Sequence, residues 1–179
     1  MFDEVGGLPA HPLMVHAPVI LVPLTALVAI AYTVIPAWRP RFGWALGLLS
    51  IAAPITAFGA TLSGEVFAVK RGIAASPQVA IHSNLGATLR NLTILVAVLA
   101  IALLIVERVR TQGSVLGNLS RAGRHGPSGA PPMPSSPVLL VASIVLALGL
   151  VGVSIAATIW VVRVCHTGAL MVWSENGGG

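Results

Sequence analysis

The chain has 179 residues and a formal net charge of +5; 56% of its residues are hydrophobic, 8% are charged, and its mean hydropathy is +0.93. Soluble domains carry about 25% charged residues, so this chain cannot cover itself with a surface that is compatible with water. The positive balance does not indicate nucleic-acid binding, because most of the charges are Arg residues that flank apolar runs, as they do in membrane proteins. The single cysteine, Cys165, excludes an internal disulfide framework.

Four apolar stretches approach or exceed the roughly 20 residues that cross the hydrocarbon core of a bilayer. Nothing alternates over the length of a barrel strand, so helices are the expected spanning elements. The expected spans are residues 12–35, 43–69, 77–106 and 138–165. Residues 107–137, rich in Gly, Ser, Pro and Arg, are expected to form a mobile cytoplasmic loop. The prediction is an all-α, polytopic membrane protein, with residues 1–179 forming one four-helix transmembrane bundle.

Lys and Arg residues predict the orientation of this bundle, because cytoplasmic segments next to spans carry an excess of them. One side of the predicted bundle holds Arg39, Arg41, Arg108, Arg110, Arg121 and Arg124. The other side holds Lys70 and Arg71. The loop of residues 107–137 is therefore expected in the cytoplasm, and both termini are expected outside it.

The alternating directions of the helices bring five ionisable residues into one layer near the outer interface. His11 and His16 open the first span, Glu65 lies in the last turns of the second, His82 lies in the second turn of the third, and His166 ends the fourth. For His11 and His166 alone, a hydrated imidazole among the lipid headgroups is the favoured interpretation. His16, Glu65 and His82 lie a turn or more inside, where polar groups need partners and ionisable ones by default mark function.

Arg90 lies about two turns deeper than His82 and about 80° around the same helix. An Arg at this depth needs a counter-charge or must extend toward the interface. One interpretation is an ion pair between Arg90 and Glu65 that locks the second span to the third. The other is an Arg that pairs with a cofactor carboxylate, such as a haem propionate.

Two cofactor chemistries fit this layer, and the residues leave both open. Haem iron takes two axial ligands on facing helices, which His16 and His82 would supply, with Arg90 at a propionate. A Zn, Fe or Cu ion takes three or four His or carboxylate ligands, for which the available set is His16, Glu65, His82 and His166. The carboxylate favours the ion, whereas the Arg favours haem b.

These residues predict a small membrane redox module that binds haem b, or failing that a transition metal, at its outer face and exchanges electrons with a larger respiratory complex. The alternative is a non-catalytic accessory subunit of a membrane complex, in which the layer of His, Glu and Arg is structural. No independent enzymatic activity is expected, because the chain shows no Ser/His/Asp arrangement, phosphate-binding loop or Cys-x-x-Cys pair. The expected partners are the lipid bilayer and that larger complex, and no nucleic acid.

The segment from His11 to Pro18 has the sequence His-Pro-Leu-Met-Val-His-Ala-Pro. It resembles the His-Pro-Leu-x-x-His-x-Pro opening of a bacterial membrane family catalogued as domain-of-unknown-function family twenty-two thirty-one. The segments Ser63 to Glu65, His82 to Asn84 and His166 to Trp173 are similar to weaker motifs of the same family. The resemblance touches all four spans and implies a four-helix domain in the bacterial inner membrane, without an established activity.

Overall fold

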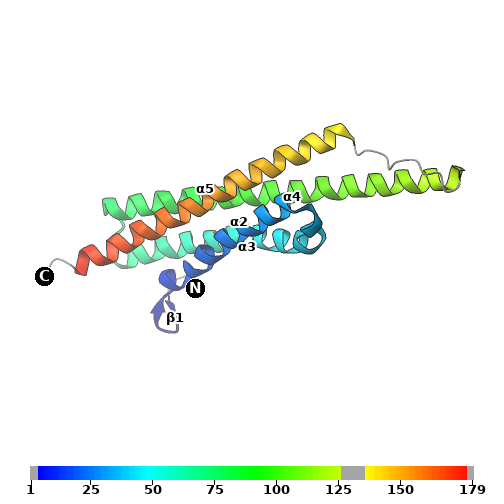
Figure 1. The fold of residues 1–179 in the computed structure, drawn as a ribbon. Coiled ribbons are helices and arrows are strands. Elements are labelled where there is room, and N and C mark those ends of the chain that lie inside the picture. Colours follow the sequence, from blue (N-terminus) through cyan, green and yellow to red (C-terminus); the bar gives the residue numbers. More distant parts are fainter. Residues whose placement is uncertain (1–3, 126–135, 177–179) are drawn as a thin grey trace.

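The computed structural model describes the backbone of residues 4–125 and 136–176, and the side chains of residues 4–113 and 136–173. Over these residues the chain forms an antiparallel bundle of four long helices (Figure 1). Each is long and apolar enough to cross a membrane, over Ala10–Val34, Pro36–Lys70, Pro77–Gly113 and Pro137–Trp173. The predicted all-α, four-helix transmembrane architecture is confirmed, and the chain is compatible with a multi-pass membrane protein.

A short hairpin precedes the first span. β1 (Glu4–Val5) pairs antiparallel with β2 (Leu8–Pro9). Gly6 and Gly7 form the turn between them with φ angles of 60° and 78°, a region in which glycine carries no steric cost. The helix α1 (Ala10–Met14) follows at once, and α2 (His16–Val34) then crosses the bundle. α1 packs against the second long helix, α3 (Arg39–Lys70).

Three more helices complete the bundle. A short 3-10 turn, η1 (Pro36–Trp38), leads into α3 (Arg39–Lys70), which begins four residues before the predicted second span. α4 (Pro77–His125) and α5 (Pro137–Asn176) both begin at a proline that follows a serine. α2 contacts α3 and α5, and α4 contacts the same two helices, so elements that are adjacent in the chain are neighbours in space.

The predicted loop of residues 107–137 is wrong over most of its length, because α4 continues as a helix to His125. In Figure 1 this part of α4 extends beyond the ends of the other helices. Residues 107–125 lack apolar periodicity but contain no proline, the first one being Pro127. Extending an existing helix avoids the cost of nucleation, so the absence of an apolar face does not end it. The rest of the predicted loop, residues 126–135, lies outside the described residues.

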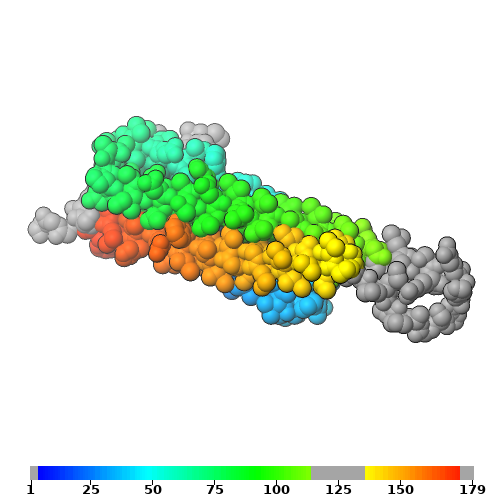
Figure 2. Space-filling view, turned by 90° about the horizontal axis from the view of Figure 1, so that it is seen from above, coloured from blue at the N-terminus to red at the C-terminus, as the bar shows by residue number. Residues whose placement is uncertain are grey.

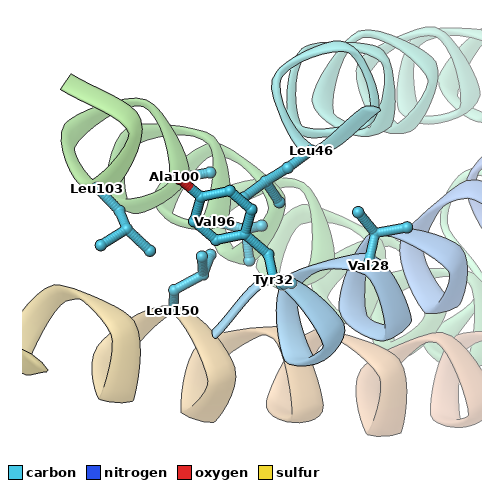
Figure 3. Close-up of a cluster of buried hydrophobic side chains, with 8 residues drawn as sticks. Val28, Tyr32, Leu46, Val96, Ala100, Leu103 and Leu150 are labelled. Atoms are coloured by element: carbon cyan, nitrogen blue, oxygen red, sulfur yellow. The ribbon is translucent and has the colours of Figure 1, made fainter. Parts of the chain in front are cut away.

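Two clusters of buried apolar side chains hold the helices together. The larger one includes Tyr32, Leu46, Leu103 and Leu150, which come from four different helices (Figure 3). The smaller one lies further along the bundle and consists of Val22, Ala53, Leu89, Ala157 and Val161. α4 and α5 lie side by side along most of their length, as Figure 2 also shows.

Large apolar side chains also cover the outside of the bundle. Ile20, Leu27, Ile55, Leu148 and Val162 are each more than 60% exposed. In water this surface would oppose folding, whereas lipid tails accept it and leave the backbone bonded inside the helices. The two ends of the bundle are polar and different. We call the end where α1 meets the end of α3 and the start of α4 the imidazole end, and the opposite end, at η1, the arginine end.

Candidate functional site

Two imidazoles from distant parts of the sequence meet at the imidazole end. The rings of His11 on α1 and His82 on α4 have centroids 6.3 Å apart and planes at 87° to one another. Phe67 of α3 stacks on the other side of His11, with ring centroids 6.0 Å apart and an interplanar angle of 29°. Both imidazoles are half-buried. The pair therefore lies inside the end of the bundle, and not in the lipid-facing surface.

The His11 ring is held by the last turns of α3. Its Nδ1 lies 3.1 Å from the carbonyl oxygen of Ala60 and 3.2 Å from the hydroxyl oxygen of Ser63. The Ser63 hydroxyl donates to the same Ala60 carbonyl at 3.0 Å. Since a carbonyl can only accept, the ring nitrogen that faces it is the protonated one. The tautomer of His11 with hydrogen on Nδ1 satisfies this arrangement and leaves a lone pair on Nε2.

The His82 ring is held in the same way by α5. Its Nδ1 lies 3.0 Å from the hydroxyl oxygen of Thr167. Thr167 itself donates to the backbone carbonyls of Val164, at 3.0 Å, and Arg163, at 3.2 Å. A hydroxyl whose hydrogen is used in this way accepts from the ring, so the Nδ1 of His82 is also the protonated nitrogen. In both rings Nε2 becomes the atom with a free lone pair.

The other residues of the predicted site lie apart from this pair. His16, Glu65 and His166 all have exposed side chains. Within residues 4–113 and 136–173, no three side chains of the His, Cys, Asp and Glu types are grouped closely enough to hold a metal ion. The structure thus brings His82 together with His11, and not with the other three predicted ligands.

Helix rotation explains why these residues separate. His11 lies on α1, which ends at Met14, whereas His16 opens α2, and the two side chains face different ways: His11 is half-buried and His16 is exposed. Glu65 follows Gly64, the residue that contacts His11, and it therefore turns away from that ring. His166 precedes Thr167, which bonds His82, and is displaced in the same manner. The direction in which each side chain faces, and not its place along the chain, therefore decides that His82 meets His11 instead of His16.

Arg90 is half-buried, and its guanidinium carbon lies 5.7 Å from the centre of the Phe58 ring on α3. This is a cation–π contact, which is worth about 0.5–2 kcal/mol depending on desolvation. The predicted ion pair with Glu65 is not formed: over the side chains that the structure describes, the ion pairs are those of Glu107 with Arg39 and Arg110. Arg90 is thus held by an aromatic ring and has no carboxylate opposite it.

A polar network at the arginine end was missed by sequence reasoning. Glu107 of α4 accepts from Arg39 of α3 at 2.9 Å, from Arg110 at 2.8 Å, and from the hydroxyl of Ser143 on α5. Arg39 also donates to the carbonyl oxygen of Tyr32 at 3.3 Å, so the network joins all four long helices. One signal was available in the sequence: Glu107 is the only acid among the Arg residues of this side. One carboxylate is shared here by two guanidinium groups, so the network keeps a net positive charge while it joins the four helices.

Comparisons of the chain with protein-family models, with curated proteins and with solved structures found no match. The resemblance of the opening motif to the bacterial membrane family therefore stays a prediction. What can be said of function rests on the geometry of the imidazole pair and its surroundings.

Proposed function

We propose that the chain is a small redox subunit of the bacterial inner (plasma) membrane, in which His11 and His82 bind a metal centre at the imidazole end. The centre is the iron of haem b or a single transition-metal ion. In this proposal the imidazole end and both termini lie outside the cytoplasm, and the partner that exchanges electrons with the centre is a larger respiratory complex. The supporting observation is the meeting of two imidazoles, each held through Nδ1, at a centroid distance of 6.3 Å.

The distance suits a shared ion. Two imidazoles that bind one ion from opposite sides, each through one nitrogen at about 2.0 Å, have ring centroids roughly 6 Å apart. Metal-bound histidines commonly donate their other ring N–H to a carbonyl or a similar acceptor, which sets the tautomer and makes the ligand nitrogen more basic. Ala60 supplies such an acceptor for His11, and Thr167 supplies one for His82.

The number of protein ligands favours haem, whereas the available space favours a single metal ion. Haem iron needs only two protein ligands, and this pair supplies two. A Zn, Fe or Cu ion wants one or two ligands more, which water or a partner protein would have to add. A macrocycle, however, needs more room than an ion, and α1 is the element that would have to move to admit it. α1 has only five residues, so it is the least anchored of the helices around the pair.

Arg90 has a place in the haem version of this proposal. It lies eight residues after His82 on α4, a rise of about 12 Å, which is within the span of a haem and its propionates. Its guanidinium contacts the ring of Phe58 and forms no ion pair within the described side chains, so a propionate would supply a counter-charge.

The test is an optical spectrum and a metal analysis of the full chain purified in mild detergent. We expect a Soret band, or about one bound Fe or Cu ion per chain, in the unmodified protein. His11→Ala and His82→Ala should each abolish the band or the bound metal. His16→Ala is the matched control, because His16 is exposed and only five residues from His11, and it should retain both. Protein that carries neither haem nor metal, even after reconstitution, would exclude the proposal.

The accessory-subunit alternative is favoured by one observation: each ring of the pair already has a hydrogen-bond partner inside the bundle. Such a pair can serve to join α1, α3, α4 and α5 without any bound group. In that case His11→Ala and His82→Ala lower only the stability, by about 1–3 kcal/mol for a buried partner left unpaired. Unmodified protein without a cofactor, combined with this loss of stability, would support the alternative.

A further inference from the structure

Buried hydroxyl groups along the bundle axis behave in two ways. Thr25 donates to the carbonyl oxygen of Leu21 at 2.6 Å, and Thr93 donates to that of Arg90 at 2.7 Å. Bonds of this kind to the preceding turn are the usual solution for Ser and Thr in membrane helices. Ser154 of α5 differs: it is 2% exposed, and its hydroxyl has no hydrogen-bond partner among the described residues. Its donor therefore points somewhere other than to its own helix.

Ser154 is one of the residues that line a small cavity between the helices. Thr25 of α2 and Thr93 of α4 line the same cavity, and the rest of the wall is apolar and includes Val22 and Ala157. All these side chains are buried. The space open to the centre of a water-sized sphere is about 10 Å³. Ser154 lies near the middle of the span Pro137–Trp173, so the cavity is close to the middle of the membrane.

We propose that this cavity binds one water molecule, which links α2, α4 and α5. The donors and acceptors balance. Thr25 and Thr93 use their own hydrogens on carbonyls of their helices, so each hydroxyl oxygen keeps a lone pair that can accept a further hydrogen bond. The water donates one hydrogen to each of these two oxygens and accepts the hydrogen of Ser154. Three hydrogen bonds is the typical number for a buried water.

The surroundings explain why the water is needed at this position. In the middle of a membrane there is no bulk water to bond an unpaired hydroxyl, and lipid tails contain no hydrogen-bond acceptor. Ser50 of α3, whose hydroxyl is equally buried, donates to the carbonyl oxygen of Gly47 at 3.0 Å. At Ser154 the water accepts the hydroxyl hydrogen, as the Gly47 carbonyl does for Ser50, and it also links three helices.

Two variants of the full chain in detergent test the proposal by the sign of their effect. Ser154→Ala removes one of the three partners of the water, so the melting temperature should fall below that of Ser50→Ala by roughly 2–4 °C. Ser50→Ala is the matched control, because it removes an equally buried hydroxyl that is bonded within its own helix. In a dry cavity Ser154→Ala would remove an unpaired donor, and the melting temperature would stay equal to that of the control or exceed it. That result would overturn the proposal.

A double variant and a direct observation complete the test. If one water connects Ser154 to Thr93, the loss for Ser154→Ala combined with Thr93→Val should be smaller than the sum of the two single losses, because the first change already weakens the water. Strictly additive losses would count against the link. A high-resolution crystal structure should show a density peak at hydrogen-bonding distance, about 3 Å, from the Ser154 oxygen. Continuous apolar contact without a peak would refute the site.

Discussion

Two glycines, which have no side chain, leave room for the imidazole rings of His11 and His82. A Cβ atom on Gly64 would lie 3.0 Å from the Cε1 atom of His11 and 3.2 Å from its Nδ1. A Cβ atom on Gly168 would lie 3.2 Å from the Cε1 atom of His82. At these distances a side chain would displace the ring that it faces. The backbones of α3 and α5 therefore form part of the wall around the pair, and any larger residue at either position would move an imidazole away from its hydrogen-bond partner.

We expect Gly64→Ala to lower the free energy of unfolding by about 1–2 kcal/mol, since overpacking costs ~1–3 kcal/mol and the better helix propensity of Ala returns up to ~1 kcal/mol. Gly59→Ala is the matched control on the same helix, because no atom lies within 4 Å of its Cβ position. The control should be as stable as the parent or more so. Thermal unfolding in one detergent measures both. Equal stability of the two variants would mean that the His11 ring can shift without loss.

The identity of the paired histidine could not be predicted from the sequence alone. His11 and His16 both open the first span, and the deeper of the two was the natural candidate for a buried ligand. The helix breaks between α1 and α2, after Met14, and α1 turns His11 toward Ala60 and Ser63 of α3. This rotation depends on the fit of a small α3 surface against the imidazole. The depth of a residue follows from the sequence, but the direction in which it faces depends on its neighbours.

At the level of the helices, Glu107 is the residue that connects the arginine end. Its side chain is 13% exposed, and those of Arg39 and Arg110 are 27% and 18% exposed. Breaking a fully buried pair costs about 3–5 kcal/mol, and partial exposure reduces this. We expect Glu107→Gln to lower the free energy of unfolding by about 2–3 kcal/mol.

Glu65→Gln is the control for this change, because Glu65 is exposed and forms no ion pair within the described side chains. Its effect should stay within about 0.5 kcal/mol. Chemical unfolding of both variants in the same micelles supplies the comparison. If Arg39→Gln is added to Glu107→Gln, part of the loss should return, since the stranded cation is removed with its partner. Absence of any recovery would show that the pair with Arg39 contributes little.

The helical extension of α4 has a measurable consequence. Replacing Gly113 to Ser135 by a short Gly/Ser linker removes the part of α4 from Gly113 to His125, so the helical signal in circular dichroism should fall. The melting temperature should change little, because the described core clusters lie between residues 21 and 164 of the bundle and contain no residue from 105–145. A large fall in the melting temperature would instead indicate that this segment supports the bundle.

On the scale of the whole molecule, the number of spans and the antiparallel arrangement were predictable, because the thickness of the bilayer sets the length of every apolar stretch. The residues at which the helices begin and end were less predictable. α3 begins at Arg39 and α4 ends at His125, both beyond the apolar stretches, since a helix continues into the headgroup region and past it at little cost. The network around Glu107 was not predicted, because it depends on four helices meeting at one level. The thickness of the bilayer sets the lengths of the spans, whereas the polar contacts between helices depend on how the helices pack.

The orientation of the molecule decides on which side of the membrane the imidazole pair lies. The arginine end carries Arg39, Arg41, Arg108 and Arg110, whereas the imidazole end carries Lys70 and Arg71. Glu107 offsets part of the first group, but acids weigh little in the positive-inside rule, so the arginine end should face the cytoplasm. A reporter enzyme that is active only in the cytoplasm should therefore work when inserted after His125 and be silent when fused after Gly179.

A reporter that is active only outside the cytoplasm provides the control at the same two positions. It should give the reciprocal pattern, which separates a true orientation from a failure of expression. A third insertion at Gly72, in the turn between α3 and α4, should agree with the C-terminal fusion, because Gly72 and the end of α5 at Asn176 both lie at the imidazole end. If all three positions gave the opposite result, the imidazole pair would face the cytoplasm. A metal centre at His11 and His82 would then exchange electrons with a cytoplasmic partner, and the proposed outward-facing subunit would have to be abandoned even if the centre itself were found.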